Sequence, residues 1–219
     1  MDDTLFDFAR TEEINLFSTL ARFGITADAQ ILMRFREINL GLWQEFERGE
    51  TTKEQIKICR FQRLFDEYKY SADAAASAEY YVKNFEEICI PFDGADKFLN
   101  TLSRLGRVYI VTNGNTDIQN RHIADAGFLP LIDGMFISDE IGFAKPSVQF
   151  ADYVKNHIEG FESERAVWIG DSLTSDRACA EVAGVDFILF TPHGVPEGYT
   201  GVSAGNYEEI LDNINKNYS

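Results

Sequence analysis

The chain changes its pattern of hydrophobic positions near residue 90. Before that point, apolar residues recur at steps of three and four, and Ile31, Phe35, Ile38, Leu42 and Phe46 form one stripe of this kind. The same spacing predicts further helices near residues 11–23, 51–65 and 73–88. Thr51 and Glu54 have the spacing of a capping box at the start of one of them. These segments together predict a small helical bundle.

After Pro91, short β-rich segments alternate with helical ones. The predicted strands are 107–112, 135–137, 166–169 and 186–190, and the predicted helices around them are 96–105, 118–126, 148–157, 175–183 and 207–217. Such alternation predicts βαβ units and a parallel sheet covered by helices on both faces. We therefore predict an α/β, Rossmann-like core of residues 1–9 and 90–219, into which a helical cap of residues 10–89 is inserted.

Composition narrows the classes of ligand. A chain of 219 residues with 45% apolar and 26% charged residues can bury an ordinary globular core. Its net charge of −16 would repel nucleic acid polymers and anionic membranes, so a small metabolite is the expected partner. Neither a membrane span nor a signal peptide is visible, and the three cysteines fit reduced thiols, so we expect a cytoplasmic protein, as a monomer or homodimer.

Polar residues follow the predicted strands at the places where ligands bind in open parallel sheets. They fall in four short segments, which are Asp2-Asp3-Thr4, Thr112-Asn113-Gly114, Lys145-Pro146, and Gly170-Asp171-Ser172 with Asp176. Phosphoryl transfer needs an oxygen nucleophile, a proton donor, fixed cations and a metal, and these segments offer carboxylates, a hydroxyl and an ammonium for such a task.

Each segment taken alone also has a purely structural explanation. The first can be an acidic terminus, and Asn113-Gly114 can be a turn. Pro146 suits the first turn of a helix, Asp171 or Ser172 can be an N-cap, and Asp176 can be a first-turn residue favoured by the helix dipole. The four segments in this order are stronger evidence for a functional site than any one of them alone.

In this order the four segments resemble the motifs of the haloacid dehalogenase superfamily. Those motifs are Asp-x-Asp-x-Thr, a Thr or Ser after a strand, a Lys before a helix, and Gly-Asp followed by a second Asp. The run Asp2-Asp3-Thr4-Leu5-Phe6-Asp7-Phe8 and the cap segments 39–49 and 59–61 are similar to the bacterial pyrimidine 5′-nucleotidase type, within the subclass that carries a helical cap. The resemblance implies Mg²⁺-dependent hydrolysis of a small phosphorylated metabolite, such as a nucleoside 5′-monophosphate, through an aspartyl-phosphate.

The resemblance also implies a role for each matching residue. Asp2 is the acid/base, and its backbone carbonyl is a ligand of Mg²⁺. Thr112 and Asn113 bind phosphate, and Lys145 balances the charge of nucleophile and phosphate. Asp171 binds the metal directly, and Asp176 supports the metal site. Mg²⁺ prefers carboxylate and water oxygens, which suits this set of residues.

One part of the family pattern is not found. With Asp2 as the second aspartate of the motif, the nucleophilic first aspartate would precede Met1, and so would the first core strand. We expect both to lie ahead of Met1 in the native protein. Two alternatives stay open, a 2-haloacid dehalogenase-like hydrolase that needs no metal and a non-catalytic relative that binds phosphate or metal without the nucleophile.

The cap offers candidates for substrate specificity. Asn39 and Arg60 are polar positions within otherwise apolar helices, and Trp43 is a large aromatic beside them. Aromatic residues at helical spacing, such as Phe61 and Phe65, are more often packing residues than ligand contacts. We expect the cap to close over the site on hinges near residues 8–11 and 90–94.

Overall fold

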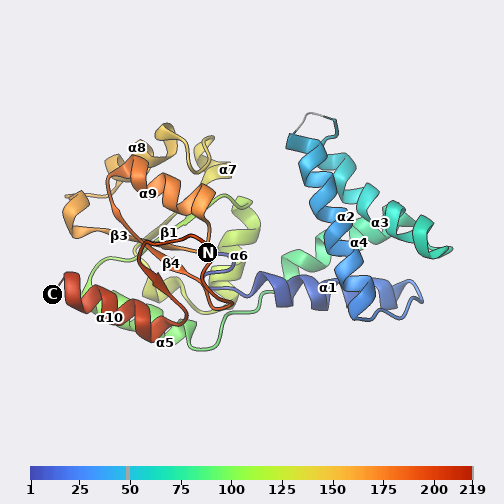
Figure 1. The fold of residues 1–219 in the computed structure, drawn as a ribbon, viewed down its shortest axis with the longest axis horizontal. Coiled ribbons are helices and arrows are strands. Elements are labelled where there is room, and N and C mark those ends of the chain that lie inside the picture. Colours follow the sequence, from blue (N-terminus) through green and yellow to red (C-terminus); the bar gives the residue numbers. More distant parts are fainter. Residues whose placement is uncertain (48–49, 219) are drawn as a thin grey trace. The chain divides into compact units, whose positions relative to one another are not determined.

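The computed structural model describes residues 1–47 and 50–218, apart from the side chains of Trp43, Phe46, Glu47 and Lys53 (Figure 1). The chain divides into two compact units. One, the α/β unit, combines Met1–Asp7 with Pro91–Ser219, and the other, the cap unit, is Phe8–Ile90. No helix in the described part of the chain is both long and apolar enough to cross a bilayer.

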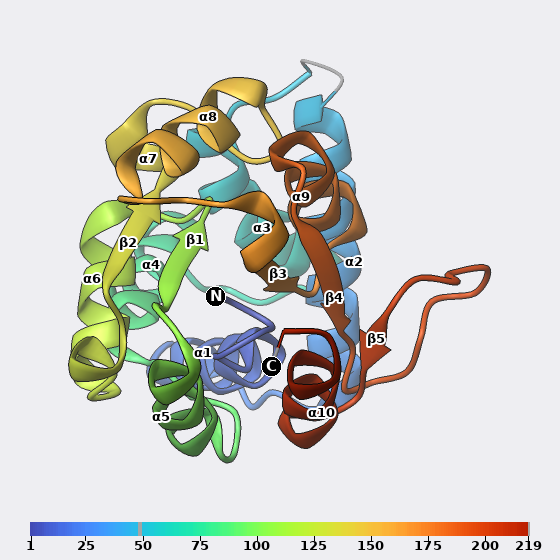
Figure 2. The same ribbon diagram turned by 90° about the vertical axis from the view of Figure 1, so that its left-hand side faces the viewer.

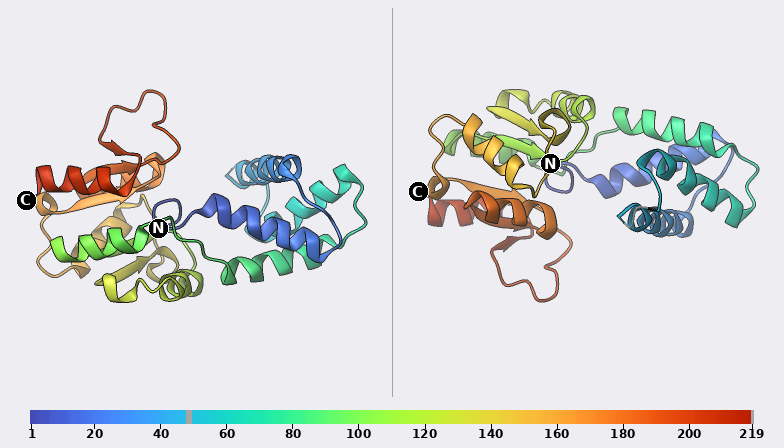
Figure 3. Two further views of the ribbon diagram at one scale, coloured as in Figure 1. Left: turned by 90° about the horizontal axis from the view of Figure 1, so that it is seen from below. Right: turned by 90° about the horizontal axis from the view of Figure 1, so that it is seen from above.

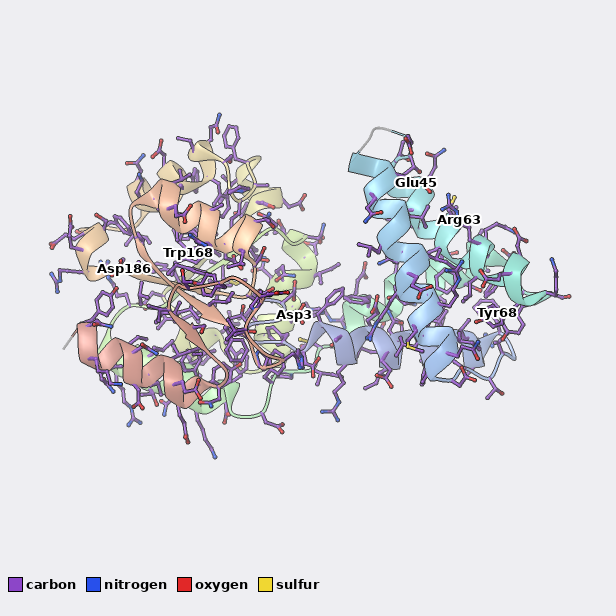
Figure 4. All side chains as sticks on the ribbon, viewed as in Figure 1. Asp3, Glu45, Arg63, Tyr68, Trp168 and Asp186 are labelled. Atoms are coloured by element: carbon purple, nitrogen blue, oxygen red, sulfur yellow. The ribbon has the colours of Figure 1, made fainter. Side chains whose placement is uncertain are left out.

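The cap unit is built from α1 (Phe8–Arg22), α2 (Ala29–Glu47), α3 (Lys53–Tyr68) and α4 (Ala74–Glu87). Its core forms around Phe35, Phe61 and Tyr81, whose ring centroids lie 5.4 to 5.6 Å apart. Phe61 and Phe65 are buried in this core, as packing residues should be. Nearer the surface, Arg63 of α3 pairs with Glu45 of α2 at 2.8 Å (Figure 4).

The capping box of α3 lies one residue later than we predicted. The Thr52 hydroxyl accepts from the backbone N–H of Gln55, and the Gln55 side chain accepts from the backbone N–H of Thr52. The predicted pairing of Thr51 with Glu54 is wrong. Two threonines in succession allow two overlapping registers, and the extended backbone of Thr52 places the helix start at Lys53.

The α/β unit contains two parallel sheets. In the first, β1 (Tyr109–Thr112) pairs with β2 (Gly134–Ile137), and in the second the order is β3 (Val167–Gly170), β4 (Asp186–Phe190) and β5 (Ser203–Ala204). The predicted α/β class is therefore confirmed. Helices return the chain between β1 and β2 and between β3 and β4, which lets these strands pair in parallel, whereas residues 191–202 lead from β4 to β5 without a helix.

Helices lie on two sides of these strands, with α8 (Val148–His157) and α9 (Ala178–Ala183) on one side and α5 (Ala95–Leu105) and α10 (Tyr207–Asn217) on the other (Figures 1 and 2). α10 runs beside α5 (Figure 3). The rings of Phe98 and Tyr207 stack there, with centroids 4.3 Å apart. The remaining elements are α6 (Thr116–Asp125), α7 (Ser138–Ile141), the 3₁₀ turns Leu129–Leu131 and Ser163–Arg165, and a π-helical turn at Leu173–Arg177.

A cavity of about 940 Å³ lies between the two sheets. Residues 109–111 of β1 and 167–169 of β3 line it from opposite sides, together with Met1 and apolar side chains of the flanking helices. Trp168 of β3 is one of the lining residues (labelled in Figure 4), and its indole N–H has no hydrogen-bond partner in the described part of the chain. The first core strand that the family motif implies stays a prediction.

Candidate active site

The N-terminal segment folds into a tight loop that presents Asp2. The Met1 carbonyl accepts from the backbone N–H groups of Thr4, Leu5 and Phe6, at 2.7 to 3.3 Å. Asp3 takes a left-handed conformation with φ of 51°, which aspartate tolerates better than most residues do. The loop is held to the rest of the α/β unit because Leu5 O accepts from Phe92 N–H at 2.9 Å.

Asp2 and Thr112 are linked through a third side chain, Gln119 of α6. Gln119 Nε2 lies 3.3 Å from Asp2 Oδ2, and Thr112 Oγ1 lies 3.4 Å from Gln119 Oε1. A Cβ at Gly114 would overlap the Gln119 side chain, so glycine is needed there. We did not single out Gln119 from the sequence, where the only signal was a polar residue within a predicted helix.

Asn113 positions the segment that carries Lys145. Its Nδ2 donates to the Lys145 carbonyl at 3.0 Å, and its Oδ1 accepts from the Lys145 backbone N–H at 2.8 Å. Both polar groups of the Asn113 side chain are therefore used by the backbone of Lys145. The phosphate-binding role that we expected of Asn113 stays a prediction.

Lys145 forms a buried ion pair with Asp176. Its Nζ lies 2.5 Å from Asp176 Oδ1 and also donates to the Val111 carbonyl at 3.2 Å. The second oxygen, Asp176 Oδ2, accepts from the Ser172 N–H at 3.2 Å. Burial alone would raise the pKa of Asp176, but the charge and hydrogen bond of Lys145 outweigh it, and this pKa lies below its ordinary value.

The backbone around Asp176 is adapted to this pair. Ser172 is the N-cap of the π-helical turn, and its hydroxyl accepts from the Ser175 N–H, so the N-cap interpretation holds for Ser172. π-helical turns are rare and are frequent at functional sites. A Cβ at Gly170 would overlap the Asp176 carboxylate, which makes glycine necessary at the end of β3.

Asp171 is the second acidic group at the end of β3. Its Oδ1 accepts from the Thr4 hydroxyl at 3.1 Å. Burial, followed by the negative charge of Asp176, raises the pKa of Asp171. The ionised form of this carboxylate is thus short of positive charge.

The backbone nitrogen of Met1 lies inside the cluster. It is buried, and the charges of the surrounding side chains act on it, namely those of Lys145, Asp2, Asp176 and Asp171. The structure therefore brings together five residues that we selected from the sequence, which are Asp2, Thr112, Lys145, Asp171 and Asp176. They come from the N-terminal loop and from segments that follow β1, β2 and β3.

A hard divalent cation fits the Asp171 end of this cluster. Mg²⁺ is usually held by one or two carboxylates and keeps several waters. Asp171 offers a carboxylate whose charge is poorly compensated, whereas both Asp176 oxygens already have donors. No group of three or more His, Cys, Asp or Glu side chains spaced for a metal occurs among the residues that the structure describes, so Asp171 would act with backbone and water oxygens.

The cap candidates lie in the cap unit. The Arg60 guanidinium stacks over Tyr81, 4.5 Å from the ring centroid, and lies 5.9 Å from the centroids of Phe35 and Phe61. Asn39 Oδ1 is buried and has no hydrogen-bond partner within the described chain. The Trp43 side chain lies outside the described residues. A role of these three residues in specificity stays a prediction.

A parallel α/β fold with acidic groups, a lysine and a threonine at its strand ends has the residue types expected of a hydrolase site. The sequence profile of the haloacid dehalogenase-like hydrolase family matches residues 1–184. The chain therefore belongs to this family, as its four motifs predicted.

Two bacterial relatives match over nearly the whole chain. The HAD-hydrolase YfnB of Bacillus subtilis is 33% identical over 98% of this chain and 93% of its own length. Its magnesium-bound crystal structure superposes with a TM-score of 0.86, at 32% identity, over 98% of this chain and 96% of that one. The pyrimidine 5′-nucleotidase PynA of Streptococcus pneumoniae is 31% identical over 99% of this chain and 93% of its own length.

A third relative is more distant. The pyrimidine 5′-nucleotidase YjjG of Escherichia coli is 26% identical over 96% of this chain and 94% of its own length. The chain is thus similar, over almost its full length, to two proteins named for the same activity.

Proposed function

We propose that this protein is a Mg²⁺-dependent phosphatase that hydrolyses pyrimidine nucleoside 5′-monophosphates through an aspartyl-phosphate. The observation that carries the proposal is the set of contacts at the strand ends, in which Gln119 links Asp2 to Thr112, Lys145 pairs with Asp176, and Thr4 donates to Asp171. The substrate class is supported by PynA and YjjG, and the metal by the magnesium-bound structure of YfnB.

Lys145 and Thr112 form the phosphate-binding part of the proposed site. The Lys145 ammonium is fixed by Asp176 and by the Val111 carbonyl, so it offers a positive charge that need not be ordered when substrate binds. The Thr112 hydroxyl supplies a hydrogen-bond donor at the end of β1. Asn113 holds the backbone of Lys145 beside Thr112 and contributes to phosphate binding through that contact.

Asp2 supplies the proton chemistry. The family motif assigns the nucleophile to an aspartate two positions ahead of Asp2. Its carboxylate attacks phosphorus, and the bond to the leaving oxygen breaks as that oxygen takes a proton from Asp2. Asp2 then accepts a proton from the water that cleaves the aspartyl-phosphate, which releases phosphate and restores both carboxyl groups.

Asp171 and the backbone carbonyl of Asp2 would hold Mg²⁺, and Asp176 would support the metal site through Lys145 and bound water. When bound, the ion supplies neutralisation of the negative charge on the phosphoryl group. Burial and the negative charge of Asp176 disfavour the ionised form of Asp171, and a cation bound there would compensate that charge.

The proposal is tested by phosphate release from a panel of phosphomonoesters, using protein expressed from its full native reading frame and, in parallel, the chain that starts at Met1. We expect Mg²⁺-dependent release in the first preparation, fastest with uridine, thymidine and cytidine 5′-monophosphates. Faster turnover of sugar phosphates would overturn the substrate class. Halide release from 2-haloacids without metal, or phosphate binding without turnover, would favour the two alternatives instead.

A further inference from the structure

Gln119 connects two groups that the proposed reaction uses at different moments. It contacts the acid/base carboxylate of Asp2 on one side and the phosphate-binding hydroxyl of Thr112 on the other. We propose that Gln119 is a positioning residue that holds Asp2 and Thr112 in register for the reaction. This inference rests on the phosphatase function proposed above.

The side-chain chemistry of Asp2, Gln119 and Thr112 determines the direction of each hydrogen bond between them. The amide nitrogen of Gln119 donates to Asp2 Oδ2 at 3.3 Å, so its amide oxygen faces Thr112. The amide oxygen cannot donate, so the Thr112 hydroxyl donates to it at 3.4 Å. The Gly114 backbone N–H then donates to Thr112 Oγ1 at 3.2 Å. The link therefore runs from the Gly114 N–H to the Asp2 carboxylate without a break.

Gln119 is a polar side chain at a buried position, which indicates that its hydrogen bonds are needed there. Gln119 and Thr112 are each only 4% exposed, and an amide removed from water is costly unless it is hydrogen-bonded. A Met or Leu side chain would fill the same space on α6 without that requirement. The neighbouring Gly114 leaves room for the Gln119 side chain, since a Cβ would overlap it. The hydrogen bonds to Asp2 and Thr112 are thus what an amide adds at this position.

The start of α6 keeps Gln119 in place. Asn115 is the N-cap, and its side chain accepts from the backbone N–H groups of Asp117 and Ile118. The Gln119 backbone N–H donates to the Asn115 carbonyl at 3.0 Å. Asn115 Nδ2 also donates to Asp139 at 3.2 Å, which ties the helix start to α7. Gln119 therefore projects from a fixed first turn of the helix.

A phosphoryl oxygen that takes the hydrogen bond of Thr112 would replace Gln119 Oε1 as its acceptor. Gln119 Nε2 can keep its contact with Asp2 Oδ2, which leaves Asp2 Oδ1 to serve the leaving oxygen. Loss of the amide should therefore harm the proton transfer to the leaving group more than the attack on phosphorus. This consequence separates a positioning role from a merely structural one.

The test compares two substrates that differ in their need for a proton. The leaving oxygen of uridine 5′-monophosphate is an alkoxide that needs one, whereas p-nitrophenolate leaves without one. In protein from the full native reading frame, we expect Gln119→Met to lower kcat on uridine 5′-monophosphate by about 30-fold or more and on p-nitrophenyl phosphate by about threefold or less. KM for the nucleotide should change less than kcat does.

Gln119→Asn is the second variant, for the case that Gln119→Met does not fold. Asparagine keeps a polar side chain, but its shorter amide cannot reach both Asp2 and Thr112. We expect the same selectivity from it. Asn120→Met, on an exposed neighbouring position of α6, is the control and should change neither substrate. Equal losses on both substrates, or no loss on either, would overturn the inference while the phosphatase function stands. A parent protein that hydrolyses neither substrate would overturn the proposed function, and the inference with it.

Discussion

The ammonium of Lys145 lies 2.5 Å from Asp176 Oδ1, and both side chains are more than nine-tenths buried. Such a pair is costly to break, because removing one partner leaves the other charged without compensation in a dry environment. The pair also fixes a positive charge beside the Val111 carbonyl, one residue before Thr112, where the proposed substrate phosphate would lie. Lys145 thus serves the folding of the α/β unit and the chemistry at the same time.

Removing Lys145 alone should therefore destabilise the protein more than removing both partners. We expect Lys145→Met to lower the free energy of unfolding by about 3 kcal/mol and the double variant Lys145→Met/Asp176→Leu to recover most of that loss. Urea unfolding of the two variants measures this. Lys155→Met, which removes an exposed pairing with Asp152, is the control and should change the free energy by less than about 0.5 kcal/mol. Equal losses in the single and double variants would contradict the account.

The two acidic residues after β3 should have opposite effects on the pH dependence of stability. The pKa of Asp176 is lowered from 3.8, so its stabilising contribution is present above that pH and is lost as the pH falls through the lower folded value. The pKa of Asp171 is raised from 3.8, so stability is lost as the pH rises through its higher folded value. At pH 7, metal-free Asp171→Asn should therefore have a higher melting temperature than the parent protein. Below pH 3.8, its melting temperature should not exceed that of the parent. Thermal melting in chelator at both pH values measures the difference, and a lower melting temperature for the variant at pH 7 would count against the assignment.

Bound Mg²⁺ should offset the loss of stability that ionised Asp171 causes at pH 7. At one hundred times its Kd, the ion should stabilise the parent protein by about 2.7 kcal/mol, seen as a rise in Tm at pH 7. Asp171→Asn should show little or no rise. Asp152→Asn, at an exposed carboxylate of α8, should respond to Mg²⁺ as the parent does. A full Mg²⁺ response in Asp171→Asn would exclude Asp171 as a ligand.

The sequence was sufficient to predict the α/β class and the main helices and strands, because periodicity reports burial directly. It also predicted that four separate segments would meet, because the carboxyl ends of parallel strands share one edge. It did not predict Gln119, because a buried glutamine within an amphipathic helix looks like a solvent-facing residue until its partners are known. The pairing of Asp176 with Lys145 was missed for a similar reason, since the two residues lie 31 positions apart and only packing brings them together.

Gly170 should be intolerant of any side chain. A Cβ there would overlap the Asp176 carboxylate, so Gly170→Ala should displace this carboxylate from Lys145. We expect the free energy of unfolding to fall by about 2 kcal/mol. Phosphate release should fall by about tenfold or more, because catalytic groups are then misplaced. Gly41→Ala is the matched control, because a Cβ at Gly41 in helix α2 meets no atom within 4 Å. That control should stabilise the protein by about 0.5 to 1 kcal/mol through helix propensity. Urea unfolding and phosphate release measure the two effects, and similar behaviour of both variants would contradict the overlap.

Arg60 should affect affinity more than turnover if it contributes to specificity. We expect Arg60→Met to raise KM for pyrimidine nucleoside 5′-monophosphates by about tenfold and to leave hydrolysis of p-nitrophenyl phosphate unchanged. Arg63→Met is the control on the same helix, because Arg63 pairs with Glu45 on the exposed side. Steady-state kinetics on both substrates measure the effect. An unchanged KM for the nucleotides would assign Arg60 to packing over Tyr81 alone.

We propose that the acidic cluster after β3 makes this protein a Mg²⁺-dependent phosphatase. The most direct measurement is phosphate release from uridine 5′-monophosphate with and without Mg²⁺, by native protein and by Asp171→Asn. We expect turnover by the native protein only with Mg²⁺, and a loss of at least about a hundredfold in Asp171→Asn under the same conditions. Turnover that survives chelation, or that Asp171→Asn retains in full, would contradict it.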